Sequence, residues 1–177
     1  MLALDAYRPD QWRDFFVMVG SSSAALTGLI FVALSLNVSV VTQDATHRYR
    51  AIDTLSGMVG VLVICALALM GGQGHVAVGI EWFVVASISG AVYVRGYFRA
   101  AHGGGNLALL LGRRVVVLAV LYLFQLFGAV LLVADRVAGL YIAAVAMVAA
   151  LAFMISGAWL LVVDAAGREP NPLDRRA

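Results

Sequence analysis

The chain has 177 residues, of which 63% are hydrophobic and 12% are charged, and its formal net charge is +2. A soluble globular protein carries charge on roughly a quarter of its residues, so this composition excludes a soluble globule and makes the lipid bilayer the solvent. The net charge is too small to indicate a nucleic-acid partner.

The first 14 residues are predicted to form an N-terminal interfacial segment. Residues 1–14 are acidic and aromatic, lack the basic start of a signal peptide, and precede an apolar run too long for the core of one. Pro9 suits the first turn of a helix, with Asp10 close to its positive end. Trp12 is typical of a membrane interface. We therefore expect the first span to be retained.

Five apolar runs are predicted to cross the membrane, because about 20 apolar residues span about 30 Å of hydrocarbon. The spans lie approximately at residues 15–41, 52–70, 76–98, 115–134 and 137–163. The connectors lie approximately at 42–51, 71–75, 99–114 and 135–136, and none is long enough to fold separately. The predicted fold class is an all-α polytopic five-helix bundle over residues 15–164, followed by a C-terminal cytoplasmic tail at 165–177.

Arginine is distributed unevenly between the two sides of this topology. One side has nine arginines: Arg48, Arg50, Arg95, Arg99, Arg113, Arg114, Arg168, Arg175 and Arg176. The other side has Arg8, Arg13 and Arg136. The positive-inside rule predicts an external N-terminus and a cytoplasmic C-terminus. Lysine is absent and Ala, Gly and Val are abundant, which suggests a GC-rich bacterial genome and hence the bacterial inner membrane.

The first span has one face rich in small and hydroxyl side chains. At 100° per residue, this face contains Gly20, Ser21, Ala24, Thr27, Gly28, Ser35 and Ser39, with Phe31 among them. One interpretation is a packing face, inside the bundle or between subunits, because small residues let helices approach closely in lipid. The other is a pore lining in which Phe31 forms an apolar constriction. The length of the face predicts a homo-oligomer.

Several polar side chains lie within or beside the spans. Gln125, near the centre of span four, is expected to make an interhelical hydrogen bond or to contact a ligand or permeating species. Glu81 is an intramembrane carboxylate, which favours a functional role, although it could also reach external water or pair with Arg136. Asp53 and Asp164 lie near the inner arginines, where an ion-pair network is favoured over a proton relay.

The sequence contains no pattern that predicts catalysis or metal binding. His47, His75 and His102 fall in three different connectors and do not have zinc-ligand spacing. The serines at 21–23 have no base near them in sequence, and the glycine-rich stretches lack phosphate-loop context. Cys65 is the single cysteine, so it is expected to be a packed apolar side chain. We expect a non-enzymatic protein without cofactor or metal.

The sequence resembles two families, the first over nearly the whole chain and the second over one short stretch. Residues 15–20 (FFVMVG), 23–37 (SAALTGLIFVALSLN), 45–55 and 156–159 resemble a bacterial, largely actinobacterial, family of small uncharacterised multi-span membrane proteins. Some of its members are labelled modulators of a membrane-bound ATP-dependent protease, which implies a regulatory partner. Residues 23–34 are also similar to the pore helix of store-operated calcium channels. Those channels have an acidic selectivity residue where this chain has Ser35, Leu36 and Asn37, so calcium selectivity is not implied.

Three functional hypotheses follow from these features. The first is an oligomeric membrane protein with a pore or ion pathway lined by the first span, gated at Phe31. The second is a regulatory or scaffold subunit that binds another membrane protein through residues 42–51 and the C-terminal tail. The third is an intramembrane enzyme or lipid-handling protein with substrate near Glu81 or Gln125. In each case the lipid bilayer is a partner.

Overall fold

The computed structural model describes residues 7–36, 45–101 and 107–166, which contain five α-helices and no strand. The helices are α1 (Pro9–Leu36), α3 (Ala45–Ala68), α4 (His75–Ala101), α5 (Leu107–Val133) and α6 (Val137–Ala166). Each is long and apolar enough to span a membrane. The structure confirms the predicted all-α class with five candidate membrane spans.

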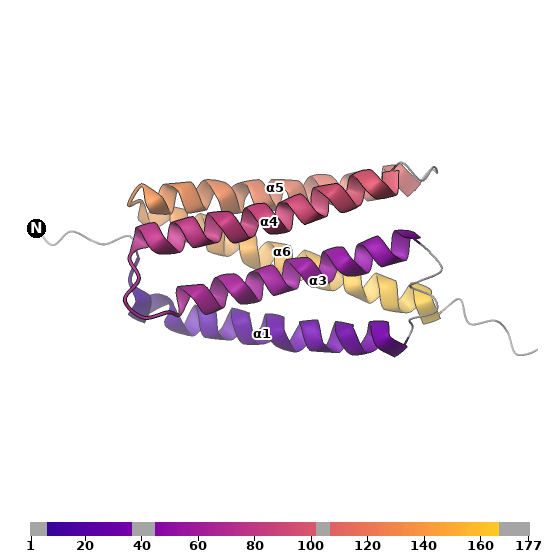
Figure 1. Ribbon diagram of the computed structural model, residues 1–177, viewed down its shortest axis with the longest axis horizontal. Helices are drawn as coiled ribbons and strands as arrows, with labels where there is room; N and C mark the ends of the chain where they lie inside the picture. Colours follow the sequence, from indigo (N-terminus) through magenta and orange to yellow (C-terminus); the bar gives the residue numbers. More distant parts are fainter. Residues whose placement is uncertain (1–6, 37–44, 102–106, 167–177) are drawn as a thin grey trace, which may run out of the picture.

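The helices run in alternating directions along one bundle (Figure 1). α1 begins at the end that also holds the link 69–74 and the turn 134–136, called here the N-terminal end of the bundle. α6 ends at the opposite, C-terminal end. α3 packs against α1, α4 and α6, while α5 joins α4 to α6. α1 lies at the edge of the bundle and packs mainly on α3, with few contacts to α6.

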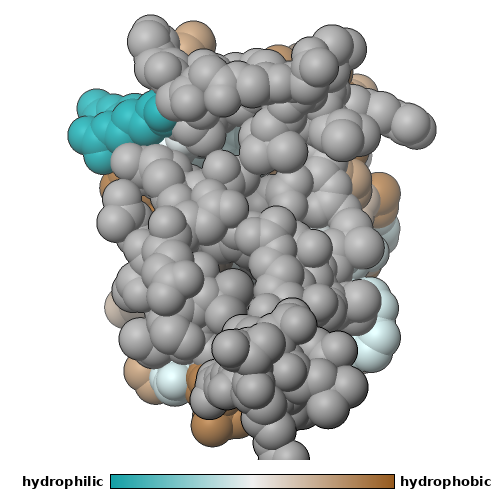
Figure 2. All heavy atoms as spheres, turned by 90° about the vertical axis from the view of Figure 1, so that its right-hand side faces the viewer, coloured by the Kyte–Doolittle hydropathy of each residue, from teal (hydrophilic) through white to brown (hydrophobic). Residues whose placement is uncertain are grey.

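The flanks of the bundle are apolar. Figure 2 looks onto the C-terminal end, and most of the coloured side chains visible around its rim are hydrophobic. Large apolar side chains such as Leu29, Phe31, Leu123, Val145 and Trp159 are each more than 60% exposed along the helices. In water this exposure would cost free energy, whereas lipid tails are as apolar as these side chains, so it accords with a membrane location.

Two short connections at the N-terminal end match the predicted turns. Gly72, in the link 69–74, has a φ of 80°, a backbone conformation that glycine adopts without steric cost. Asp135, in the turn 134–136, has a φ of 58°, which Asp tolerates better than most residues. The amide of Arg136 donates to the Leu131 carbonyl oxygen at 2.9 Å and closes the end of α5.

Several helices extend beyond the predicted membrane spans. α1 begins at Pro9, where proline was expected in the first turn of a helix, so residues 9–14 of the predicted interfacial segment are helical. α3 begins at Ala45 and α5 at Leu107, so both helices start within the predicted connectors 42–51 and 99–114. Polar and charged residues ended each predicted span, but they do not end a helix, because helical hydrogen bonds continue wherever the helix projects beyond the hydrocarbon.

At Gly128 and Gly139 the backbones of α5 and α6 are so close that neither position has room for a side chain. A Cβ atom built on Gly128 would lie 2.6 Å from the Gly139 carbonyl oxygen and 2.7 Å from the Ala143 amide nitrogen. A Cβ built on Gly139 would lie 2.5 Å from both the Gly128 carbonyl oxygen and the Leu132 amide nitrogen. The two backbones are therefore in direct contact, as small residues allow in membrane helix pairs.

Candidate functional site

The small-residue face predicted for the first span is divided in two by the structure. Gly20 is buried, and a Cβ atom there would lie 2.9 Å from the Cβ of Cys65 on α3. Ala24, Gly28, Phe31 and Ser35 are exposed instead, and nothing lies within 4 Å of a Cβ built on Gly28. Gly20 therefore serves packing within the bundle, whereas Ala24, Gly28, Phe31 and Ser35 are not covered by the chain itself.

Ser23 connects α1 to α3 by a hydrogen bond. This residue was not part of the small-residue face predicted from the sequence. Its side chain is fully buried, and its hydroxyl donates to the Met58 carbonyl oxygen at 2.7 Å. It shares the buried side of α1 with Phe16, Val19 and Gly20. The spacing of these four positions, at i, i+3, i+4 and i+7, is a helical core signal that was available in the sequence.

Three other hydroxyl groups on α1 donate to carbonyl oxygens of the same helix. Ser22 donates to the Met18 carbonyl oxygen and Ser35 to the Phe31 carbonyl oxygen, each at 2.8 Å. Thr27, which is half-buried, donates to the Ser23 carbonyl oxygen at 2.7 Å. Their oxygen lone pairs remain able to accept hydrogen bonds, so these positions tolerate lipid, water or another helix.

Gln125 lies in the core and bonds across two helices. It is 2% exposed, and its Oε1 accepts a hydrogen bond from the Trp82 indole nitrogen on α4 at 3.4 Å. This contact agrees with the interhelical interpretation of Gln125. Tyr122, one turn earlier on α5, lies between Gly57 of α3 and Gly90 of α4.

Replacing Gln125 with leucine is expected to destabilise the bundle by about 1 kcal/mol, because the Trp82 N–H loses its acceptor in an apolar core. Thermal unfolding in detergent should be measured for Gln125→Leu, Trp82→Phe and the double variant. We expect the double variant to lose less stability than the sum of the two single changes. Full additivity would show that the two side chains do not interact.

A second polar cluster lies at the N-terminal end of the bundle, between the start of α1, the link 69–74 and α4. The Tyr7 side chain is buried, and its hydroxyl donates to the Ala68 carbonyl oxygen at the end of α3. Burial raises the pKa of Tyr7, and the nearby Glu81 carboxylate raises it further, so the hydroxyl keeps its proton as a donor. Nε2 of Gln73 donates to Oε1 of Glu81 at 2.8 Å.

The hydrogen-bond partner of Glu81 is therefore Gln73, and not Arg136, which was one of the alternatives left open by the sequence. The side chain of Arg136 is exposed on the turn 134–136. At the same end of the bundle, Nδ1 of His75 lies 3.7 Å from Oδ1 of Asp135, which connects the start of α4 to this turn. Within the described ranges no group of three His, Cys, Asp or Glu side chains could hold a metal ion.

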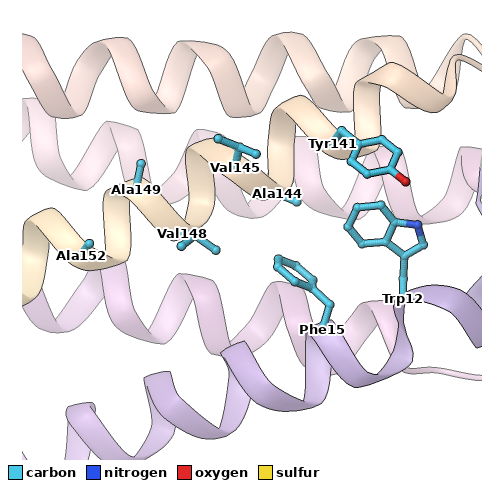
Figure 3. Close-up of a pocket in the computed structure, with 8 residues that line it drawn as sticks. All are labelled: Trp12, Phe15, Tyr141, Ala144, Val145, Val148, Ala149 and Ala152. Carbon is cyan, nitrogen blue, oxygen red and sulfur yellow. The ribbon is translucent and has the colours of Figure 1, made fainter.

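An apolar groove separates the first part of α1 from α6 (Figure 3). It has a volume of about 510 Å³ and is lined by Trp12, Phe15, Tyr141, Ala144, Val145, Val148, Ala149 and Ala152. At its N-terminal end, the Trp12 and Tyr141 rings meet edge to face with centroids 4.9 Å apart. Since its lining is aromatic and aliphatic, the groove offers mainly apolar contact.

The remaining predicted site residues are placed only in part. Arg95 and Arg99 are exposed on the last turns of α4, near the C-terminal end of the bundle. Ser39 lies outside the described residues, as do the side chains of Arg48, Arg50, Arg113 and Arg114. Cys65 is buried on α3, as expected for a packed thiol.

The comparisons with known proteins give no relative. No family model matches the chain, and neither a curated protein nor a solved structure matches it. The geometry of the described residues therefore carries the functional argument.

Proposed function

We propose that this protein is a non-enzymatic homo-oligomer of the bacterial inner membrane, in which the outward face of α1 lines a pathway for small solutes or ions. The outward face is defined here as Ala24, Gly28, Phe31 and Ser35. In this proposal the N-terminus is external and the C-terminus is cytoplasmic, as the arginine distribution favours.

The observation that carries the proposal is that the chain leaves this outward face uncovered. α1 is the least buried of the five spans and packs mainly on α3. Phe31 is 64% exposed, and Gly28 has open space around it. In lipid, small residues promote close contact between helices, and copies of one chain then tend to close into a ring. A ring around α1 would bring the Phe31 side chains together near its axis.

The outward face also has the chemistry of a gated pathway. The hydroxyl of Ser35 retains lone pairs for water, and the Phe31 ring one turn away would form an apolar constriction that gates by excluding water. The exposed guanidinium groups of Arg95 and Arg99 at the C-terminal end favour anions as the permeating species.

Reducing the constriction should open the pathway. In chloride-flux assays on protein-containing liposomes, we expect Phe31→Ala to raise the flux several-fold over the wild type. Leu123→Ala is the matched control, because Leu123 on α5 is exposed to the same degree, 63% against 64% for Phe31. It should leave the flux unchanged.

Equal fluxes for the wild type and Phe31→Ala would remove Phe31 as a gate. If neither protein conducts more than empty liposomes, the conduction proposal fails. The outward face of α1 would then remain a surface for binding another membrane protein.

A further inference from the structure

Two buried oxygen atoms at the N-terminal end of the bundle have no hydrogen-bond partner. They are Oε1 of Gln73 and Oε2 of Glu81, and they are the only buried side-chain nitrogen or oxygen atoms without a partner in the part of the chain that the structure describes. Both belong to side chains already joined by the bond from Gln73 Nε2 to Glu81 Oε1. Buried polar atoms are nearly always satisfied in native proteins, so this pair lacks a donor or a cation.

Two further oxygen atoms, those of the Tyr7 hydroxyl and the Ala68 carbonyl, belong to the cluster around Gln73 and Glu81. The Tyr7 hydroxyl is close enough to Glu81 for the carboxylate charge to raise the pKa of Tyr7. The same hydroxyl donates to the Ala68 carbonyl oxygen, so the end of α3 belongs to the same cluster. The C-terminus of a helix carries partial negative charge on its last carbonyl groups. His75 lies near this end, but it is paired with Asp135. The carboxylate of Glu81 therefore has a neutral amide as its hydrogen-bond partner.

The chemistry of the cluster favours a small monovalent cation. Amide, carboxylate and main-chain oxygens are the ligands of hard cations. A single carboxylate balances one positive charge, so a monovalent ion leaves no net charge at the site, whereas a divalent ion would leave one. Helix C-termini beside side-chain oxygens hold Na⁺ in membrane transporters, where the same physical requirement applies.

We propose that Gln73 and Glu81 form a binding site for one Na⁺ ion, coordinated by Oε1 of Gln73 and Oε2 of Glu81 beside the C-terminus of α3. The bound ion ties the link 69–74 to α4, since its two side-chain ligands come from these two segments. The site lies apart from the outward face of α1 and does not depend on the conduction proposal.

The test is thermal unfolding of the purified full chain in detergent, with NaCl, KCl or choline chloride at equal ionic strength. A ligand that binds only the folded state raises the unfolding temperature as its concentration increases. We expect the wild type to unfold at a higher temperature in NaCl than in choline chloride, with saturation as the NaCl concentration rises. Glu81→Gln, which keeps the shape and can still bond to Gln73, should lose this Na⁺-dependent shift.

Two further variants make the result decisive. Asp10→Asn removes an exposed carboxylate at the same end of the bundle and should keep the Na⁺ shift. Gln73→Ala removes the second ligand from the link and should lose it, which provides a readout if Glu81→Gln does not fold. Equal unfolding temperatures in all three salts, or a Na⁺ shift retained in both site variants, would overturn the site. A proton could occupy the position instead of Na⁺. In that case acid, and not Na⁺, would raise the unfolding temperature of the wild type, and Glu81→Gln at neutral pH would unfold at the same raised temperature. This result would also overturn the Na⁺ site.

Discussion

Replacing Gly128 or Gly139 with alanine is expected to break the backbone contact between α5 and α6. Each added methyl group would be placed 2.5–2.7 Å from main-chain atoms of the facing helix. Backbone atoms cannot rotate away as a side chain does, so α5 and α6 must separate and lose contacts along their length. We expect a loss of at least about 3 kcal/mol, the upper part of the usual range for overpacking.

Thermal unfolding in detergent measures this loss, with size-exclusion chromatography to report on aggregation. Gly112→Ala is the matched control on α5, because nothing lies within 4 Å of a Cβ at that position. It should leave stability unchanged or raise it slightly, since alanine favours helices more than glycine does. If Gly128→Ala behaves like this control, the two backbones are not in contact.

Replacing Gly20 with isoleucine is expected to detach α1 from α3. A Cβ alone at Gly20 would already lie 2.9 Å from the Cys65 Cβ, and isoleucine adds three further carbon atoms. The displaced helix would also lose the hydrogen bond between Ser23 and the Met58 carbonyl oxygen. Cys65 is the only cysteine and is 1% exposed, so its reaction with N-ethylmaleimide reports the detachment directly. We expect slow labelling in the wild type and fast labelling in Gly20→Ile.

Gly28→Ile is the matched control on the same helix, and we expect it to leave α1 attached to α3. Because nothing lies within 4 Å of its Cβ position, this variant should keep Cys65 protected and the monomer stable. If the outward face of α1 forms the proposed subunit contact, Gly28→Ile should dissociate the oligomer, as native mass spectrometry would show. Slow Cys65 labelling in Gly20→Ile would contradict the packing described for α1.

The number of helices and the position of their turns could be predicted because both depend on local properties. Crossing the hydrocarbon requires about 20 apolar residues, and five runs met that requirement. Gly71–Gly74 and Asp135–Arg136 interrupt those runs with residues that suit turns, and both positions are turns in the structure. The helix ends at Ala45 and Leu107 could not be placed in this way, because hydropathy marks the edge of the membrane and not the end of a helix.

The site was harder to predict because it depends on which helices are neighbours. Helical periodicity grouped Gly20 with Gly28, but the position of α3 buries the first and leaves the second open. Glu81 was recognisable as an unusual carboxylate, whereas its pairing with Gln73 depends on how the link 69–74 folds back onto α4. The contact of Gly128 with Gly139 was missed, although two glycines on either side of a three-residue turn are a signal for a close hairpin.

The hairpin of α5 and α6 also has a consequence for how the protein enters the membrane. These helices contain the two most hydrophobic of the five spans, and only Ala134–Arg136 separate them. The turn is only three residues long, and Arg136 is its single basic residue, so little polar chain separates the two helices. We therefore expect α5 and α6 to leave the translocon together as a single insertion unit, already in contact at Gly128 and Gly139.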